Sequence, residues 1–211
     1  MRETKGILIV VSGFSGAGKG TLMKKLLEEY DNYALSISAT TRAPRPGEVD
    51  GREYFFRTTE EFEKMIAHDE LIEYAKYVNN YYGTPKDYVM EQLEAGKDVV
   101  LEIEIQGALK IKEMFPDAVL MFIIPPTAKE LESRLRGRGT EDDATVKARL
   151  KRAIEESEGV EQYDYIIAND EVENCVARIH SIVTAKKCEA SNNYQTINNI
   201  REELKIFSEG E

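Results

Sequence analysis

The sequence predicts an α/β fold in which helices flank a parallel sheet. Fully apolar runs alternate with amphipathic stretches, and this alternation is typical of a parallel sheet covered by helices on both faces. A glycine-rich turn separates the first apolar run, Ile7 to Val11, from a helix expected over Thr21 to Tyr30. A chain of 211 residues can bury roughly 70% of the surface that its unfolded form exposes, so it needs no disulfide or metal to hold a core.

Hydrophobic periodicity and capping residues define the remaining elements. Apolar runs predict strands over Asp98–Ile105, Ala118–Ile124 and Tyr165–Ala168. Helical spacing and helix-start signals predict seven further helices. One begins near Thr58, and one covers a charged stretch that ends near Glu158. The others are expected over Thr84–Gly96, Gln106–Met114, Thr127–Arg136, Glu171–Lys187 and Asn193–Phe207.

The stretch Ser36–Tyr88 interrupts this alternation. It is rich in Tyr, Arg, Thr and Gly and has only short strand-like pieces, Glu53–Phe56 and Leu71–Tyr77. We therefore expect an inserted subdomain. The expected division is a core (1–35, 97–126 and 159–187), an inserted subdomain (36–96), a charged helical segment (127–158) and a C-terminal helical extension (188–211).

The C-terminal extension carries one apolar stripe with 3-4-3 spacing, which is typical of an amphipathic helix. Its members are Ile197, Ile200, Leu204 and Phe207. The stripe could dock on the body or on a second subunit, so the sequence leaves monomer and homo-oligomer as alternatives.

Composition disfavours several classes of protein. The net charge is −11, from 28 Lys and Arg against 39 Asp and Glu, whereas non-specific nucleic-acid binding needs a basic surface. The longest apolar run, Ala118–Ile124, is far shorter than the roughly 20 residues of a membrane-spanning helix. Cys175 and Cys188 form no metal-binding pattern and no disulfide framework. We expect a cytoplasmic protein that binds neither nucleic acid nor membrane.

The turn after the first strand has the pattern of a phosphate-binding loop (P-loop). Its glycines let backbone N–H groups point inward at a helix N-terminus, where anions bind. Lys19 adds a positive charge for the β- and γ-phosphates, which makes it a catalytic candidate. The candidate ATP-binding residues of this loop are Gly13, Ser15, Gly16, Ala17, Gly18, Lys19, Gly20 and Thr21.

The loop departs from the usual pattern at one position, because Gly20 follows the lysine where Ser or Thr is standard. The hydroxyl that usually binds Mg²⁺ is therefore absent or displaced by one residue to Thr21. A GTPase would also need NKxD and DxxG motifs, and neither occurs. A kinase with two nucleotide pockets and a basic lid fits the remaining sequence better.

A longer and more specific run, SATTRAPRPGEVDGREY, extends from Ser38 to Tyr54. Together with Glu73, Asn80–Gly83 and Arg136–Thr140, it resembles the guanylate kinase family, and the resemblance covers about Gly6 to Lys187. The resemblance implies transfer of the γ-phosphoryl group of ATP to GMP, with Mg²⁺ bound to the ATP. It also implies a P-loop core, a GMP-binding subdomain and a lid.

The resemblance implies seven residues that bind GMP, and their chemistry suits that ligand. Arg42 and Arg45 have the fork-shaped cations that grip a phosphate, and Arg42 is also a catalytic candidate. Glu73 can accept both N1–H and N2–H of guanine. The candidate GMP-binding residues are Ser38, Arg42, Arg45, Tyr54, Glu73, Tyr82 and Glu104.

Glu102 and Glu104 lie two residues apart, so we expect them on one face of a strand, near its carboxyl end. We interpret Glu102 as a ligand of Mg²⁺ through water and Glu104 as a second contact to guanine. A pair of exposed carboxylates on an edge strand is the alternative.

Arginines in the expected lid resemble those that close over ATP in the family. Arg134 and Arg138 are candidates for ATP binding, and Arg138 and Arg149 are catalytic candidates. Asn169 lies in a segment that resembles the family's loop beside the adenine of ATP. An ordinary structural role, in a loop or as a helix cap, fits this residue nearly as well. The other two arginines of this region, Arg136 and Arg152, are interpreted as surface charge.

Two further functions compete with a guanylate kinase. A kinase for another nucleoside monophosphate is disfavoured by the guanine-matching pair Ser38 and Glu73. A non-catalytic, guanylate-kinase-like binding module would typically lack the phosphate loop, whereas Lys19 and its glycines are intact here.

Overall fold

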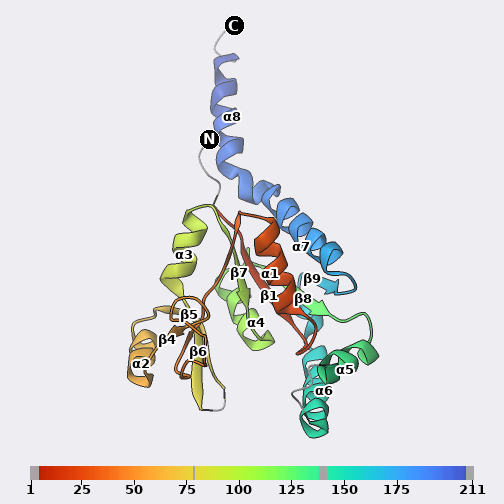
Figure 1. Cartoon of the computed structure of the whole chain (residues 1–211). Coiled ribbons are helices and arrows are strands. Elements are labelled where there is room, and N and C mark those ends of the chain that lie inside the picture. Colours follow the sequence, from red (N-terminus) through yellow and green to blue (C-terminus); the bar gives the residue numbers. More distant parts are fainter. Residues whose placement is uncertain (1–4, 78, 138–141, 208–211) are drawn as a thin grey trace.

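The structure, a computed structural model, describes residues 5–77, 79–137 and 142–207. Its larger sheet has five parallel strands in the order β2-β7-β1-β8-β9 (Figure 1). The strands are β1 (Leu8–Gly13), β2 (Tyr33–Leu35), β7 (Asp98–Glu102), β8 (Val119–Ile124) and β9 (Tyr165–Ala168). The α/β class with a parallel sheet is therefore confirmed.

Helices cover both faces of this larger sheet. Alternate residues of β1 point to opposite sides, so Ile9 packs with α1 and α7 whereas Val10 packs with α3 and α4. Both side chains are fully buried. The helices are α1 (Lys19–Glu29), α3 (Lys86–Glu94), α4 (Ile105–Met114) and α7 (Val172–Lys187).

A smaller mixed sheet is inserted between β2 and α3. Its strand order is β4-β3-β6-β5, and Phe62 of helix α2 (Thr59–Ala67) is fully buried in its own small core. A capping box, formed by Thr58 and Glu61, begins α2 where the sequence predicts a helix start. The strands are β3 (Ala39–Thr40), β4 (Phe55–Phe56), β5 (Leu71–Tyr77) and β6 (Asn80–Pro85).

The next helix, predicted with Pro85 at its first helical position, starts one residue later. Thr84 and Pro85 belong to β6, where they pair with Glu73 and Leu71 of β5. Cross-strand pairing therefore competes with the helix-start signal, and α3 begins only at Lys86.

The strand predicted over 98–105 is also shorter than expected. β7 ends at Glu102, and Glu104 is the N-cap residue of α4. The hydroxyl of Ser12 donates a 2.6 Å hydrogen bond to the carbonyl of Ile103, where the chain leaves the sheet. Glu102 and Glu104 therefore do not share a strand face.

The helices α5 (Ala128–Gly137) and α6 (Asp143–Ser157) form a separate lobe beside the carboxyl ends of the strands (Figure 1). Leu131, Leu135 and Val146 join them in a small cluster, which also touches Phe14 of the glycine-rich loop. The turn η1 (Val160–Gln162) then leads back to β9.

The helix α8 (Tyr194–Leu204) extends away from both sheets (Figure 1). The turn η2 (Ala190–Asn193) precedes it and η3 (Lys205–Phe207) follows it. The side-chain amides of Asn192 and Asn193 donate to the carbonyls of Lys186 and Lys187, both at 2.7 Å, so they cap the end of α7. Within the described ranges, no helix combines the length and hydrophobicity that crossing a membrane requires.

Candidate active site

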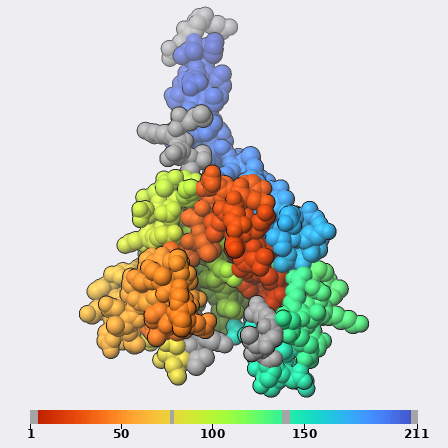
Figure 2. All heavy atoms as spheres, in the orientation of Figure 1, coloured from red at the N-terminus to blue at the C-terminus, as the bar shows by residue number. Residues whose placement is uncertain are grey.

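The carboxyl ends of β1, β7 and β8 face the space between the small sheet and the α5–α6 lobe (Figure 1). Figure 2 shows the surface hollowed there, between the orange atoms of the inserted subdomain and the green atoms of α5 and α6. Ligands of open α/β sheets bind at this edge. The elements that carry most of the residues predicted from the sequence are the loop after β1, the small sheet, α5 and α6.

The glycine-rich loop connects β1 to α1 at the rim of the hollow. Gly18 caps α1 in the left-handed region, with φ of 93°, and a Cβ there would lie 2.4 Å from Nδ2 of Asn169. Only glycine satisfies both conditions. The ammonium group of Lys19 donates to the carbonyl of Gly13 at 2.6 Å, so the side chain folds back over the loop.

Two residues predicted to bind ATP form hydrogen bonds with this loop. The amide of Asn169 donates to the carbonyl of Ala17 at 2.7 Å. Arg134 donates to the same carbonyl at 3.3 Å and to the carbonyl of Asn169 at 3.0 Å, while Glu130 holds its Nε at 2.9 Å. These hydrogen bonds therefore connect α5 and the end of β9 to the loop.

A second arginine reaches the loop from α6. Arg149 donates from Nη1 to the hydroxyl of Ser15 at 2.6 Å. The predicted residue Arg138 lies outside the described residues. Gly16 lies on the loop. Gly20 and Thr21 lie in the first turn of α1, where Thr21 is exposed.

Across the hollow, Arg42 is held by a residue that the sequence reasoning missed. Both carboxylate oxygens of Glu48 lie 2.9 Å from Nη2 of Arg42, and Glu48 also accepts the backbone N–H of Arg45 at 2.7 Å. These contacts lower the pKa of Glu48, the Arg45 N–H foremost. The signal was available, because Glu48 belongs to the specific run around Arg42.

Aromatic residues of the small sheet complete this acceptor cluster, which comprises Arg42, Glu48, Tyr54 and Tyr82. The guanidinium of Arg42 lies 5.3 Å from the centre of the Tyr54 ring, whose own centre is 6.1 Å from that of Tyr82. Ser38 precedes β3, and its carbonyl accepts the N–H of Phe55 at 2.9 Å. The side chain of Arg45 is exposed.

Glu73 lies on β5 with a hydroxyl partner on the neighbouring strand. The hydroxyl of Thr84 donates to Oε1 of Glu73 at 2.8 Å. Burial raises the pKa of Glu73, and the hydrogen bond from Thr84 lowers it. A Cβ on Gly107 would lie 3.2 Å from Oε2, so the first turn of α4 lies against this carboxylate. Thr84 was missed because only the strand register reveals it.

Glu102 ends β7, next to β1 and its loop. Desolvation raises the pKa of Glu102, Lys19 lowers it and Glu104 raises it. Among the residues that the structure describes, no group of three or more His, Cys, Asp or Glu could hold a metal ion by itself. A lone carboxylate fits Mg²⁺, which usually takes one or two protein ligands together with water and substrate phosphates.

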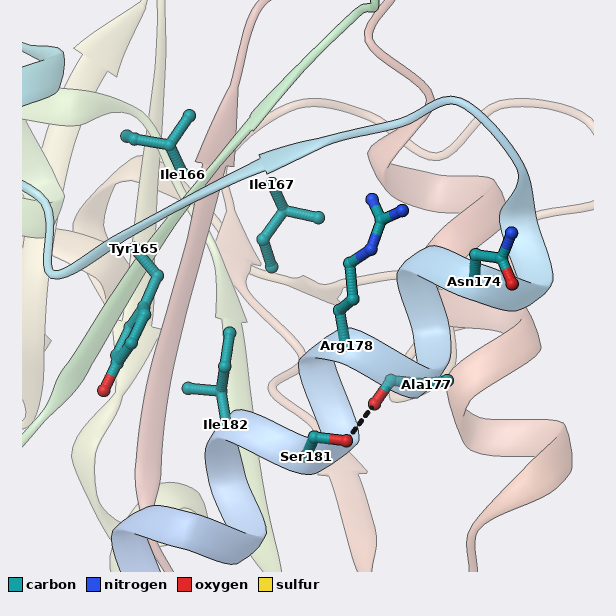
Figure 3. Close-up of a pocket in the computed structure, with 8 residues that line it drawn as sticks. All are labelled: Tyr165, Ile166, Ile167, Asn174, Ala177, Arg178, Ser181 and Ile182. Atoms are coloured by element: carbon teal, nitrogen blue, oxygen red, sulfur yellow. Dashed lines mark hydrogen bonds between the residues drawn. The ribbon is translucent and has the colours of Figure 1, made fainter.

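A groove between β9 and α7 lies apart from these groups (Figure 3). Its charged residue, Arg178, is paired with Asp170 at 3.1 Å. The residues that line the groove are Tyr165, Ile166, Ile167, Asn174, Ala177, Arg178, Ser181 and Ile182. It contains none of the predicted site residues.

A phosphate loop at the carboxyl edge of a parallel sheet defines a P-loop protein. The sequence model of guanylate kinase matches residues 5–186. This chain therefore belongs to the guanylate kinase family.

Individual relatives agree with this assignment. The chain is 52% identical to the guanylate kinase of Caldanaerobacter subterraneus subsp. tengcongensis, over 95% of this chain and 98% of that protein. It is 54% identical to the guanylate kinase of Halalkalibacterium halodurans, over 89% and 92%. The crystal structure of guanylate kinase from Anaplasma phagocytophilum is similar, with a TM-score of 0.71, 36% identity and 88% coverage of each chain.

Proposed function

We propose that this protein transfers the γ-phosphoryl group of MgATP to GMP, giving ADP and GDP. The observation that carries the proposal is the pairing of a phosphate loop with the acceptor cluster and Glu73 across one hollow. In phosphoryl transfer the protein mainly positions the reactants and neutralises charge. The two sides would supply these functions to a donor and an acceptor nucleotide.

On the donor side, backbone amides of the loop would bind the phosphates and Lys19 would neutralise charge on the γ-phosphoryl group. Arg149 already touches the loop through Ser15, so a small movement of α6 would bring it to the transferring group. Arg134 and Asn169 would hold the loop beneath the nucleotide. Arg138 is proposed as a further lid arginine.

On the acceptor side, Arg42, Arg45, Tyr54 and Tyr82 would bind the phosphate of GMP. Glu48 orients Arg42 while leaving Nε available to donate. Such preorganisation lowers the entropy cost of binding.

The base would be read by the groups around Glu73. Its ionised carboxylate would accept N1–H and N2–H of guanine, with Thr84 fixing its orientation. Adenine presents a lone pair at N1, which would face the carboxylate unfavourably. Ser38 is proposed to donate to O6, and Glu104 to contact guanine a second time.

The site residues fit one Mg²⁺ ion carried with ATP. Glu102 through water, and Thr21, are the proposed ligands, because hard oxygen donors suit this ion. The ion, when bound, would neutralise charge on the phosphates of the nucleotide.

The domain division, the partners and the cellular location are proposed on the same basis. The core is 1–35, 97–126 and 159–187, with 36–96 as GMP-binding subdomain, 127–158 as lid and 188–211 as C-terminal extension. The partners are the two nucleotides, without nucleic acid or membrane, in a cytoplasmic protein of net charge −11.

The proposal is tested by ADP formation from MgATP with GMP, AMP, UMP, CMP and dTMP in parallel, beside a reaction without acceptor. We expect rapid ADP release with GMP only. Turnover with another monophosphate would keep the phosphotransferase and reject the assignment of Glu73 and Ser38. Binding of ATP without turnover of any acceptor would favour a binding module.

Replacing Glu73 with glutamine is expected to lower kcat/KM for GMP by about 10²-fold, because an amide NH₂ would face a guanine donor. KM for ATP should change little, and Glu63→Gln, an exposed change on α2, is the control. Burial raises the pKa of Glu73, so in the parent protein KM for GMP should rise as pH falls through that raised pKa. An unchanged KM for GMP in the variant would reject the base-reading role.

A further inference from the structure

Arg152 of α6 reaches the acceptor side, although its sequence suggested only surface charge. Its Nη2 donates to Oε2 of Glu104 at 3.0 Å, and its Nε donates to Glu156 at 2.8 Å. Arg152 thus bridges a carboxylate at the start of α4 to one near the end of α6. Interpreting it as plain surface charge is therefore incomplete.

The bridge offsets the repulsion between two neighbouring carboxylates, Glu104 and Glu156. Burial raises the pKa of Glu156, Arg152 lowers it and neighbouring Glu104 raises it again. The side chain of Glu156 is only 15% exposed, whereas that of Glu104 is 70% exposed. Without Arg152, Glu104 would move away from Glu156 into solvent, because its exposed side chain is the freer of the two.

The position of Glu104 matters because it begins the helix that lies against Glu73. Gly107, one turn further on, is the residue whose Cβ would meet the carboxylate of Glu73 at 3.2 Å. Arg152 therefore fixes a carboxylate at the edge of the proposed guanine pocket.

The same face of α6 also contacts the donor side. Arg149 and Arg152 are three residues apart, so they project from neighbouring positions of the helix. Arg149 bonds to Ser15 of the phosphate loop, and Arg152 bonds to Glu104. One helix of the lid thus touches both halves of the site.

We propose that Arg152 is a positioning residue for GMP, which acts by holding Glu104 at the acceptor pocket and thereby links the lid helix to acceptor binding. This inference rests on the proposed function, since it takes GMP as the acceptor. It assigns Arg152 no contact with either nucleotide.

The test measures GMP binding by calorimetry in the absence of ATP, with the full chain. Arg152→Ala should weaken GMP binding by about fivefold, the size expected for a half-exposed charge-assisted hydrogen bond. ATP binding should be unchanged, and Arg152→Lys should retain part of the affinity. Lys151→Ala, which removes the same charge from the preceding residue of the same helix, should bind GMP like the parent protein.

A double-mutant cycle shows whether Arg152 acts through Glu104. Glu104→Gln should weaken GMP binding to a similar extent, and Arg152→Ala combined with Glu104→Gln should cost no more than the larger single change. Glu156→Gln should recover part of the affinity lost in Arg152→Ala, because it removes the repelling carboxylate. Fully additive losses, or an Arg152→Ala protein that binds GMP normally, would overturn the inference.

Binding and turnover separate this inference from the proposed function. A parent protein that binds GMP with the expected cycle but does not phosphorylate it would reject the phosphotransferase and keep the role of Arg152. Normal GMP turnover, with GMP binding unaffected by Arg152→Ala, would keep the phosphotransferase and reject the role of Arg152. A parent protein that fails to bind GMP would reject both.

Discussion

Replacing Lys19 with alanine is expected to lower kcat for GMP phosphorylation by about 10³-fold, the upper range for losing one preorganised group that stabilises developing charge. The ammonium group donates to the carbonyl of Gly13 at 2.6 Å, within the loop itself. Steady-state kinetics with MgATP and GMP measure the effect. Thermal unfolding should show that the fold is retained.

The matched control for this change is Lys24→Ala. Lys24 lies on the same helix, is exposed and pairs with Glu28 at 3.9 Å, on the surface of the helix. It should turn over GMP normally. Near-normal turnover by Lys19→Ala would instead remove the phosphate loop from the mechanism.

Replacing Arg149 with alanine should also lower kcat by about 10³-fold, the lower range for arginines that neutralise a transferring phosphoryl group. The contact from its Nη1 to Ser15 Oγ, at 2.6 Å, places it beside the loop. Lysine should not restore the rate, because it lacks the planar fork of donors that arginine offers. KM for GMP should change little, since Arg149 contacts the phosphate loop through Ser15.

Arg136→Ala is the control for Arg149. Arg136 is another lid arginine, but it pairs with Glu132 and Asp143 within the α5–α6 lobe. Its loss should leave kcat close to that of the parent protein. If Arg149→Ala lost affinity for GMP and kept its kcat, Arg149 would belong to the acceptor side instead.

Strands that the sequence predicted well are those whose side chains are buried on both faces. In β1 the buried positions apart from Ser12 are apolar, as are all those of β8, and Ile9, Val10 and Met121 are fully buried. Such runs have no other stable place in a soluble fold. β6 was missed because Asn80, Gly83 and Pro85 disfavour strands, and it forms by pairing with β5.

The candidate site also has a part that the sequence predicts and a part that only the structure shows. The phosphate loop is contiguous in the sequence, so the residues around Lys19 were predictable together. The contact between Thr84 and Glu73 depends on strand register, and that between Arg152 and Glu104 depends on how α6 packs. Glu104 was placed on a strand because periodicity alone cannot show where a chain turns out of a sheet.

The neighbouring places of β2 and β7 have a consequence for how acceptor choice can change. The chain leaves the large sheet after Leu35 and returns to it at Asp98, and these two strands pair directly, with Leu35 opposite Val100. Because the two strands are parallel, the intervening segment leaves at the carboxyl end of β2 and re-enters at the amino end of β7. Its last helix, α3, makes the return and packs on the large sheet through Val89 and Leu93. The part before α3 has a core of its own, so we expect that this part could differ without changing the order of the strands that carry the phosphate loop.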